Sequence, residues 1–162
     1  MRADLENAVA TELLSFGLVS NNDTNFRNVA LWLARDPLYC SMRLDVVRHL
    51  HAAMASRTLL AATLQGQLVG LLSWHAITDE AAQMAIRGGR LPDASAMSAP
   101  GDAIFIGMTT ASQPGAVKKI LQTFCRLKRG KVIVFERHHS GGRATQRIGW
   151  VDRVGKLRGG AV

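Results

Sequence analysis

The sequence predicts an α/β protein with a single mixed β-sheet flanked by helices. Apolar residues at helical spacing come first, and short apolar runs of strand length follow, interrupted by two further helical segments. The expected order is leading helices, a hairpin, a helix, and then strand, helix, strand, strand, which is typical of helices packed on both faces of one sheet. At 162 residues with no internal repeat, the chain is expected to be a single domain, residues 1–162.

The first expected element is a helical extension over residues 1–20. Gly17 closes it, and apolar residues recur through it at helical spacing. These residues are Leu5, Val9, Leu13 and Leu14. The core of the protein is expected over residues 24–154, followed by a tail over residues 155–162.

Two helices are expected at the start of this core. Thr24 or Asn25 can cap the first, and Pro37 stops it because proline cannot continue a helix. The second begins near Ser41. The apolar residues expected to face the core from these helices are Val29, Leu31, Trp32, Leu33, Leu44, Val47, Leu50 and Met54.

The period then changes from helix to strand. Residues 58–64 and 68–74 are short apolar runs joined by Gln65-Gly66-Gln67, a pattern that predicts a β-hairpin. A helix is expected from Thr78 to Ile86, because acidic residues suit its N-terminus and a glycine pair ends it. The remaining expected elements are a loop at 90–101, a strand at 103–106, a helix at 114–129 that buries Val117, a strand at 131–135, a loop at 137–143 and a strand at 145–154.

Charge is distributed unevenly along the chain. Residues 1–100 hold 8 Lys/Arg and 9 Asp/Glu, whereas residues 101–162 hold 12 and 3, so the formal charge of +8 resides in the last third. This asymmetry favours encounter with a polyanion, either an acidic protein or nucleic acid, without choosing between them.

Cysteine usage and the first residues indicate the expected compartment. Cys40 and Cys125 are far apart, and acidic residues interrupt the first twenty positions, so there is no secretory signal pattern. We expect two reduced thiols in a cytoplasmic protein, or in a virion if a phage encodes the chain. No apolar run has the roughly 18 residues that a membrane span requires.

An ordered series of short motifs carries a family resemblance. The motifs are Val29-Ala30-Leu31-Trp32-Leu33, Asp36-Pro37-Leu38, Ser73-Trp74, Gly101-Asp102, Phe105-Ile106 and Pro114-Gly115. The series resembles the toxin-activating lysine acyltransferases, small enzymes that acylate pore-forming toxins from an acyl carrier protein. The resemblance runs from about Asn28 to about Lys128, more loosely to Trp150, and implies an N-acetyltransferase-like fold.

The resemblance fails at the two catalytic positions. In that family a histidine follows Pro-Leu and acts as base or acyl carrier, and an aspartate orients it. Tyr39 stands in the place of the histidine and Gly107 in the place of the aspartate. An unperturbed phenol has a pKa of about 10 and is therefore a poor general base at neutral pH. The resemblance thus implies a degenerate acyltransferase, and it favours a protein without enzyme activity over an active enzyme.

One substitute nucleophile remains open. Cys40 directly follows Tyr39, and its thiolate could accept an acyl group as a thioester if a histidine activated it. The candidate histidines are His49, His51, His75, His138 and His139. The adjacent pair at 138 and 139 lacks a third ligand at useful spacing, so no metal site is expected.

No cofactor is expected either. The helix that begins at Pro114 is not preceded by a Gln/Arg-x-x-Gly-x-Gly/Ala pyrophosphate loop, which argues against ordinary acetyl-coenzyme A binding. Gly141-Gly142 could form an anion-binding turn, but adjacent glycines in a loop between strands are more typical of a simple turn.

A basic surface is expected on and after the helix at 114–129. Its residues are Lys118, Lys119, Arg126, Lys128, Arg129 and Lys131. No aromatic residue interleaves with them, so base stacking on single strands is not expected.

Three functions follow from the sequence. The first is a non-catalytic acyltransferase-like protein that binds protein partners in a larger assembly, for example as a structural protein of a phage virion. The alternatives are an active acyltransferase that moves an acyl group from acyl carrier protein to a protein lysine, and a small basic nucleic-acid-associated protein.

Overall fold

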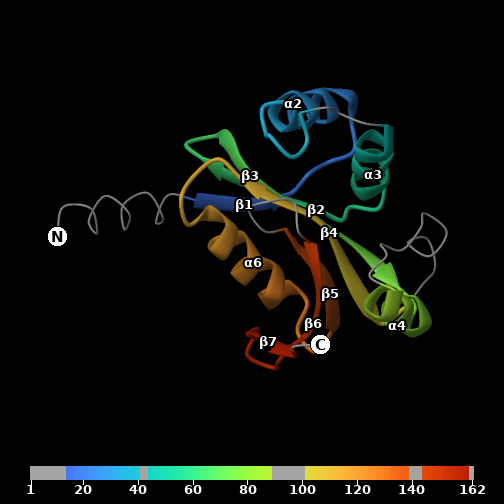
Figure 1. Ribbon diagram of the computed structural model, residues 1–162. Helices are drawn as coiled ribbons and strands as arrows, with labels where there is room; N and C mark the ends of the chain where they lie inside the picture. The colour runs from blue at the N-terminus through green and yellow to red at the C-terminus, as the bar shows by residue number, and fades with distance from the viewer. Residues whose placement is uncertain (1–13, 41–43, 89–100, 139–143, 161–162) are drawn as a thin grey trace. The chain divides into compact units, whose positions relative to one another are not determined.

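The computed structural model describes residues 14–40, 44–88, 101–138 and 144–160 (Figure 1). The strands form one sheet in the order β1-β2-β3-β4-β5-β6-β7. β1 pairs antiparallel with β2 and β2 with β3, β4 pairs parallel with β5, and β5, β6 and β7 are antiparallel. The expected mixed sheet flanked by helices is therefore confirmed.

The chain divides into two compact units. Unit 1 is Met1–Ser73 with Met108–Thr123, and unit 2 is Trp74–Gly107 with Phe124–Val162. Three elements have residues in both units: β3 (Gln67–Ile77), β4 (Ala103–Ala111) and α6 (Ala116–Leu127). The single-domain assignment stays a prediction.

Two helices build the core of unit 1. In α2 (Asp23–Leu33) and α3 (Leu44–Ala55), apolar residues three and four positions apart lie on one face and pack together. The buried cluster consists of Val29, Leu33, Leu50, Ala53, Met54, Leu59, Leu71 and Met108. The N-cap of α2 is Asn22, whose side chain accepts the Asn25 N–H at 2.8 Å, so the expected cap at Thr24 or Asn25 is wrong by two or three residues.

Three residues expected in the core are exposed instead. Leu31, Leu44 and Val117 each show more than a third of their surface. Leu31 lies two residues from both Val29 and Leu33, about half a turn around the helix, and therefore faces away from the cluster that they join.

The expected hairpin is present. β2 (Leu59–Leu64) pairs with β3, and the turn places Gln65 at φ 51° and Gly66 at φ 79°. Two positive φ values belong to the tight turn whose twist matches a β-hairpin, which is why glycine suits the second position.

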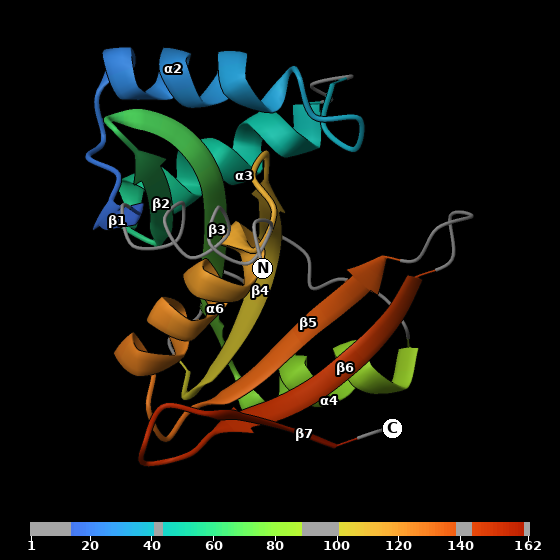
Figure 2. The same ribbon diagram turned by 90° about the vertical axis from the view of Figure 1, so that its left-hand side faces the viewer.

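In unit 2, α4 (Asp79–Gly88) packs across the sheet formed by β5 (Val132–His138) and β6 (Ala144–Val151), as Figure 2 shows. Thr78 begins α4 as expected, because its hydroxyl oxygen accepts the Ala81 N–H at 3.1 Å. The cluster beneath the helix is Ile77, Ala82, Ala103, Phe105 and Val134.

Two strands were missed by the sequence. Residues 14–18 form β1 (Leu14–Leu18) rather than the end of a helix, and residues 1–13 lie outside the described part of the chain. The expected tail contains β7 (Leu157–Gly160). Both are the outermost strands of the sheet, and both form by pairing with a neighbour, β2 or β6, that supplies their backbone hydrogen bonds.

Candidate functional site

Tyr39, which the sequence predicts to be a degenerate catalytic position, lies in the loop that follows α2, within unit 1. Tyr39 N–H donates to the Asp36 carbonyl oxygen at 3.0 Å, which folds the loop into a turn. The Tyr39 ring is half-buried and packs against the unit 1 core cluster. Burial, and after it the negative charge of Asp36, raises the pKa of Tyr39 to about 12. The phenol is therefore protonated at neutral pH, and the phenolate that could act as a base is even scarcer than the sequence predicts.

Asp36 holds this loop in place. Its Oδ1 accepts the Leu38 N–H at 2.8 Å, and its Oδ2 accepts the hydroxyl of Thr110, a buried residue of β4 in the same unit. Both carboxylate oxygens are thus used in fixing the loop to the strand. The sequence could have indicated the local turn, because aspartate often accepts a backbone N–H two residues on. It gave no signal for Thr110, which is 74 residues away.

Cys40 is exposed and makes a backbone contact. Its Sγ lies 3.5 Å from the Pro37 carbonyl oxygen. Cys125 is buried in unit 2, and burial raises the pKa of its thiol, so it is poorly suited to nucleophilic chemistry. Both cysteines are free thiols.

Gly107, the other position predicted to be degenerate, lies on β4 and is exposed. It directly follows Ile106, the last β4 residue in register with β5. Without a side chain, this position offers no group that could orient or charge a base.

The structure describes the side chains of three histidines. His49 Nε2 lies 2.7 Å from the hydroxyl of Ser73, which has no exposed surface. His51 meets the Phe26 ring edge-on. His75 is buried on β3 in unit 2, and burial lowers its pKa. The His49 contact with Ser73 was missed by the sequence, because a helix residue and a strand residue 24 positions apart show no local pattern. The side chains of His138 and His139, and the Gly141-Gly142 turn, lie outside the described residues.

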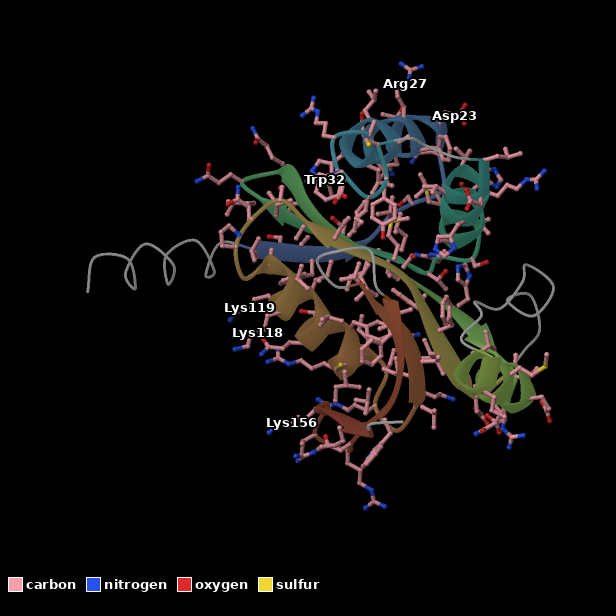
Figure 3. The ribbon with its side chains drawn as sticks, viewed as in Figure 1. Asp23, Arg27, Trp32, Lys118, Lys119 and Lys156 are labelled. Carbon is pink, nitrogen blue, oxygen red and sulfur yellow. The ribbon has the colours of Figure 1, made fainter. Side chains whose placement is uncertain are left out.

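The predicted basic surface divides into exposed and tethered residues. Lys118, Lys119 and Arg126 are exposed on α6, where Figure 3 shows the first two projecting outward, and Arg129 is exposed just after the helix. Lys131 Nζ donates to Asp102 at 2.7 Å. That hydrogen bond, and then the lysine charge, holds the pKa of Asp102 below its ordinary value.

Lys128 is the second tethered cation. Its Nζ lies 4.8 Å from the centre of the Trp74 ring, which also packs against Phe124. Burial, and after it the nearby charge of Lys131, lowers the pKa of Lys128. Lys128 therefore forms part of the packing of unit 2.

Comparison with solved structures identifies the architecture. A structure titled GphF GNAT-like decarboxylase in complex with isobutyryl-CoA matches with a TM-score of 0.52 at 18% identity, over 78% of this chain and 67% of that chain. The chain has a GNAT-like fold. The loading GNATL domain of CurA from Lyngbya majuscula gives 0.46 at 10% identity, over 80% of this chain and 71% of that one. A Staphylococcus aureus Mu50 protein provisionally named an acetyltransferase gives 0.47 at 16% identity, over 75% of this chain and 78% of that one.

At 18% identity the GphF structure supports the fold of this chain alone and says nothing of its chemistry. No known protein family matches the sequence, and no curated protein does. None of the described helices has the length and apolar character that a membrane crossing requires. Within the described ranges, no group of three or more His, Cys, Asp or Glu side chains is arranged to hold a metal ion.

Proposed function

We propose that this chain is a non-catalytic GNAT-like protein, related to the toxin-activating lysine acyltransferases, that binds protein partners instead of transferring an acyl group. The observation that carries the proposal is the state of Tyr39. A phenol with a pKa of about 12 is ionised in about one molecule in 100,000 at pH 7. A residue in that state cannot take the proton from an attacking lysine amine at a useful rate.

The second degenerate position adds to this argument. An aspartate that lost its histidine could still act as an electrostatic group, but Gly107 has no side chain and no charge. Asp36 is the carboxylate next to Tyr39, and both of its oxygens already accept hydrogen bonds that fix the loop. Its charge also opposes ionisation of the phenol.

The exposed cations of α6 supply the binding role in this proposal. Lys118, Lys119 and Arg126 project from the helix, and Arg129 follows it. An acidic protein face would meet them with complementary charge, which raises the encounter rate and makes binding sensitive to salt. A role in a larger assembly, for example a phage virion, is the setting in which we expect such a partner.

An acyl-transfer assay tests the loss of catalysis. The chain is incubated with acyl-loaded acyl carrier protein and a lysine-containing toxin segment, and the products are analysed by mass spectrometry. A competent toxin-activating acyltransferase serves as the positive control. We expect acyl-lysine at the level of the protein-free mixture. Acylation above that level that disappears in Tyr39→Phe or Cys40→Ser would show the proposal to be wrong.

The binding role has its own test. Lys118→Glu combined with Lys119→Glu should abolish retention of an acidic partner, which is measured by co-purification at two salt concentrations. Arg27→Glu with Arg48→Glu makes the same charge change on α2 and α3, and should leave retention intact. Equal loss of retention in both double variants would mean that the net charge of the protein, and not a defined surface on α6, retains the acidic partner.

One observation favours an active acyltransferase as a second candidate. His49 is an imidazole in unit 1, 2.7 Å from a hydroxyl, on the helix that follows the Tyr39 loop. In this conformation Ser73 is fully buried and cannot itself attack a substrate. His49→Gln should then abolish any measured acyl transfer. His51→Gln, which changes an exposed histidine two residues further along the same helix, should not.

A further inference from the structure

A row of three side chains crosses the outer strands of unit 2. Trp150 on β6 is directly opposite Val132 on β5 and directly opposite Arg158 on β7. Side chains of directly opposed residues in an antiparallel sheet lie on the same face. Val132, Trp150 and Arg158 therefore form a continuous strip on one face of the sheet.

This strip is the uncovered end of a face that is otherwise packed. Val134, two residues beyond Val132 and on the same face, is fully buried in the cluster beneath α4. Val132 itself is 39% exposed and Trp150 is 52% exposed. An indole with half of its surface in water is unusual, since tryptophan is highly buried on average.

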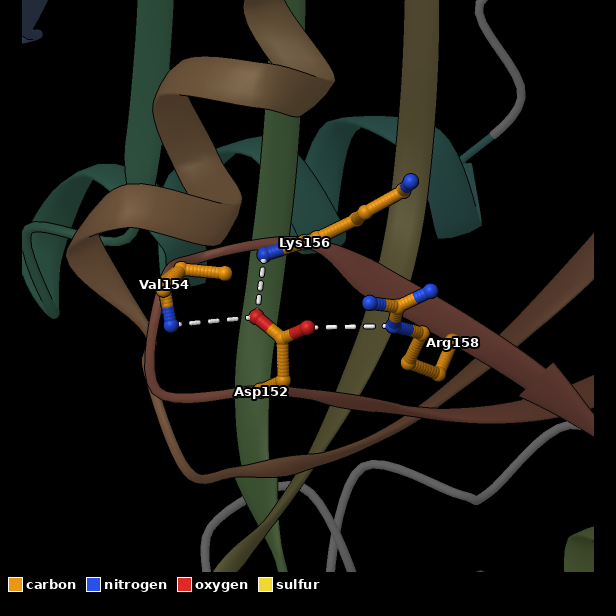
Figure 4. A network of polar contacts seen from close by, with 4 residues as sticks. All are labelled: Asp152, Val154, Lys156 and Arg158. Carbon is orange, nitrogen blue, oxygen red and sulfur yellow. Dashed lines mark hydrogen bonds and ion pairs between the residues drawn. The ribbon is translucent and has the colours of Figure 1, made fainter.

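Asp152 holds the end of the strip in one geometry. Its Oδ1 accepts the backbone N–H groups of Val154 at 3.1 Å and Lys156 at 2.8 Å, and its Oδ2 accepts Arg158 Nε at 3.0 Å (Figure 4). Because the ion pair uses Nε, the terminal amino groups of Arg158 remain able to donate to an anion, and half of the side chain is exposed.

The segment of the chain that carries the strip is strongly cationic. Residues 124–162 hold ten Lys/Arg and two Asp/Glu, a net charge of +8 that equals the formal charge of the whole chain. Backbone hydrogen bonds join Val151 to Gly130 and Lys131, so β6 ends beside the basic loop that follows α6. The turn between β6 and β7 adds Arg153 and Lys156, both exposed.

We propose that this strip, Val132, Trp150 and Arg158, binds single-stranded nucleic acid, with a base stacked on the Trp150 indole and the adjoining phosphates bound by Arg158 and its cationic neighbours. A flat aromatic face next to positive charge is the combination that single strands require. A duplex keeps its bases stacked inside and cannot offer one to an indole. An acidic protein face would use the charge, but would leave the indole without a stacking partner.

The strip supplies the aromatic surface for base stacking that the basic run on and after α6 lacks. Nucleotide binding by the strip does not depend on the proposed loss of acyl transfer. The run of cations on and after α6 has no aromatic residue within it, whereas pairing between strands brings Trp150 next to Arg158. The strip uses neither Lys118 nor Lys119, so charge reversal there should leave nucleotide stacking intact.

Binding of a fluorescein-labelled oligothymidylate of about ten nucleotides tests the proposal directly, at low salt and by fluorescence anisotropy. Trp150→Leu keeps the apolar area and removes the aromatic face, and we expect affinity to fall about tenfold. Trp150→Phe keeps a stacking ring and should stay within about threefold of the unchanged protein. Circular dichroism of each variant checks that it folds.

Two controls separate stacking from general attraction. Arg158→Gln should weaken binding, whereas Arg27→Gln, which removes one exposed charge from α2, should not. Quenching of tryptophan fluorescence by unlabelled oligothymidylate should vanish in Trp150→Leu, although Trp32 and Trp74 remain. The proposal is overturned if no binding occurs at low salt, if Trp150→Leu binds as tightly as the unchanged protein, or if polyglutamate or duplex of equal charge binds as well as the single strand.

Discussion

The loop after α2 and the turn between β6 and β7 are each organised by one aspartate, with opposite electrostatic results. Asp36 accepts the Leu38 N–H and the Thr110 hydroxyl, and its charge helps to keep the adjacent phenol neutral. Asp152 accepts two backbone N–H groups and an arginine, and keeps that guanidinium in a fixed position. One carboxylate suppresses a charge and the other orients one.

The difference follows from the groups around each carboxylate. The Asp36 loop lies against an apolar cluster and near a buried strand hydroxyl, so little solvent is available to stabilise a phenolate. The Asp152 turn is open to water and surrounded by lysine and arginine. The GNAT-like scaffold thus carries one loop whose phenol stays neutral and one turn that holds a cation in a fixed position.

The largest effect should come from breaking the Asp36 anchor. Asp36→Ala leaves the buried Thr110 hydroxyl and the Leu38 N–H without their acceptor, and a hydrogen bond to a charged group contributes about 1.5–3 kcal/mol. We expect the free energy of unfolding in urea to fall by about 2–4 kcal/mol. Thr110→Val removes the hydroxyl and keeps the shape, so it should cost less, about 1 kcal/mol. Equal losses in the two variants would argue against an unsatisfied hydroxyl as the cause.

Tyr39 can be titrated directly, because it is the only tyrosine in the chain. Phenolate absorbance near 295 nm should develop around pH 12, not at the ordinary pKa of 10.0. A raised pKa means that the folded state holds the proton more tightly, so this contribution to stability is complete below pH 10 and is lost as pH rises towards 12. Asp36→Asn removes the nearby negative charge and should move the midpoint downward. A midpoint near 10 in the unchanged protein would contradict the buried, neutral phenol.

The two loops also show what the sequence could and could not predict. The hairpin was visible in the sequence as Gln65-Gly66 between apolar runs. The loss of catalytic groups at Tyr39 and Gly107, which rests on residue identity, stays a prediction. The environment of Tyr39 was not visible, because the strand residue that anchors its loop is 74 positions away. The basic run on α6 was predicted, whereas the Trp150 strip depends on β7, a strand that exists only by pairing with β6.

Asp152→Ala should have a smaller effect than Asp36→Ala, because the turn is exposed and water can replace the lost acceptor. The hydrogen bond from the Lys156 N–H lowers the pKa of Asp152 most, with further contributions from Arg158 and the Val154 N–H. Because the pKa of Asp152 is lowered, the ionised carboxylate stabilises the folded state above the ordinary value of 3.8. This contribution to stability is lost as pH falls through the lowered pKa. The difference in melting temperature between Asp152→Ala and the unchanged protein should therefore shrink below pH 4. Asp152→Asn, which keeps one acceptor oxygen, should lie between them.

The smallest expected effect on the free energy of unfolding comes from changing His75 in unit 2. His75 should make stability sensitive to acid, whereas Tyr39 in unit 1 should make it sensitive to alkali. Burial lowers the pKa of His75 below 6.5, so protonation favours the unfolded chain. The contribution of the neutral imidazole to stability is complete above pH 6.5 and is lost as pH falls through the lowered pKa. His75→Gln should flatten the decrease in unfolding free energy between pH 7 and pH 5. If this variant keeps the same slope as the unchanged protein, His75 is not the group that titrates.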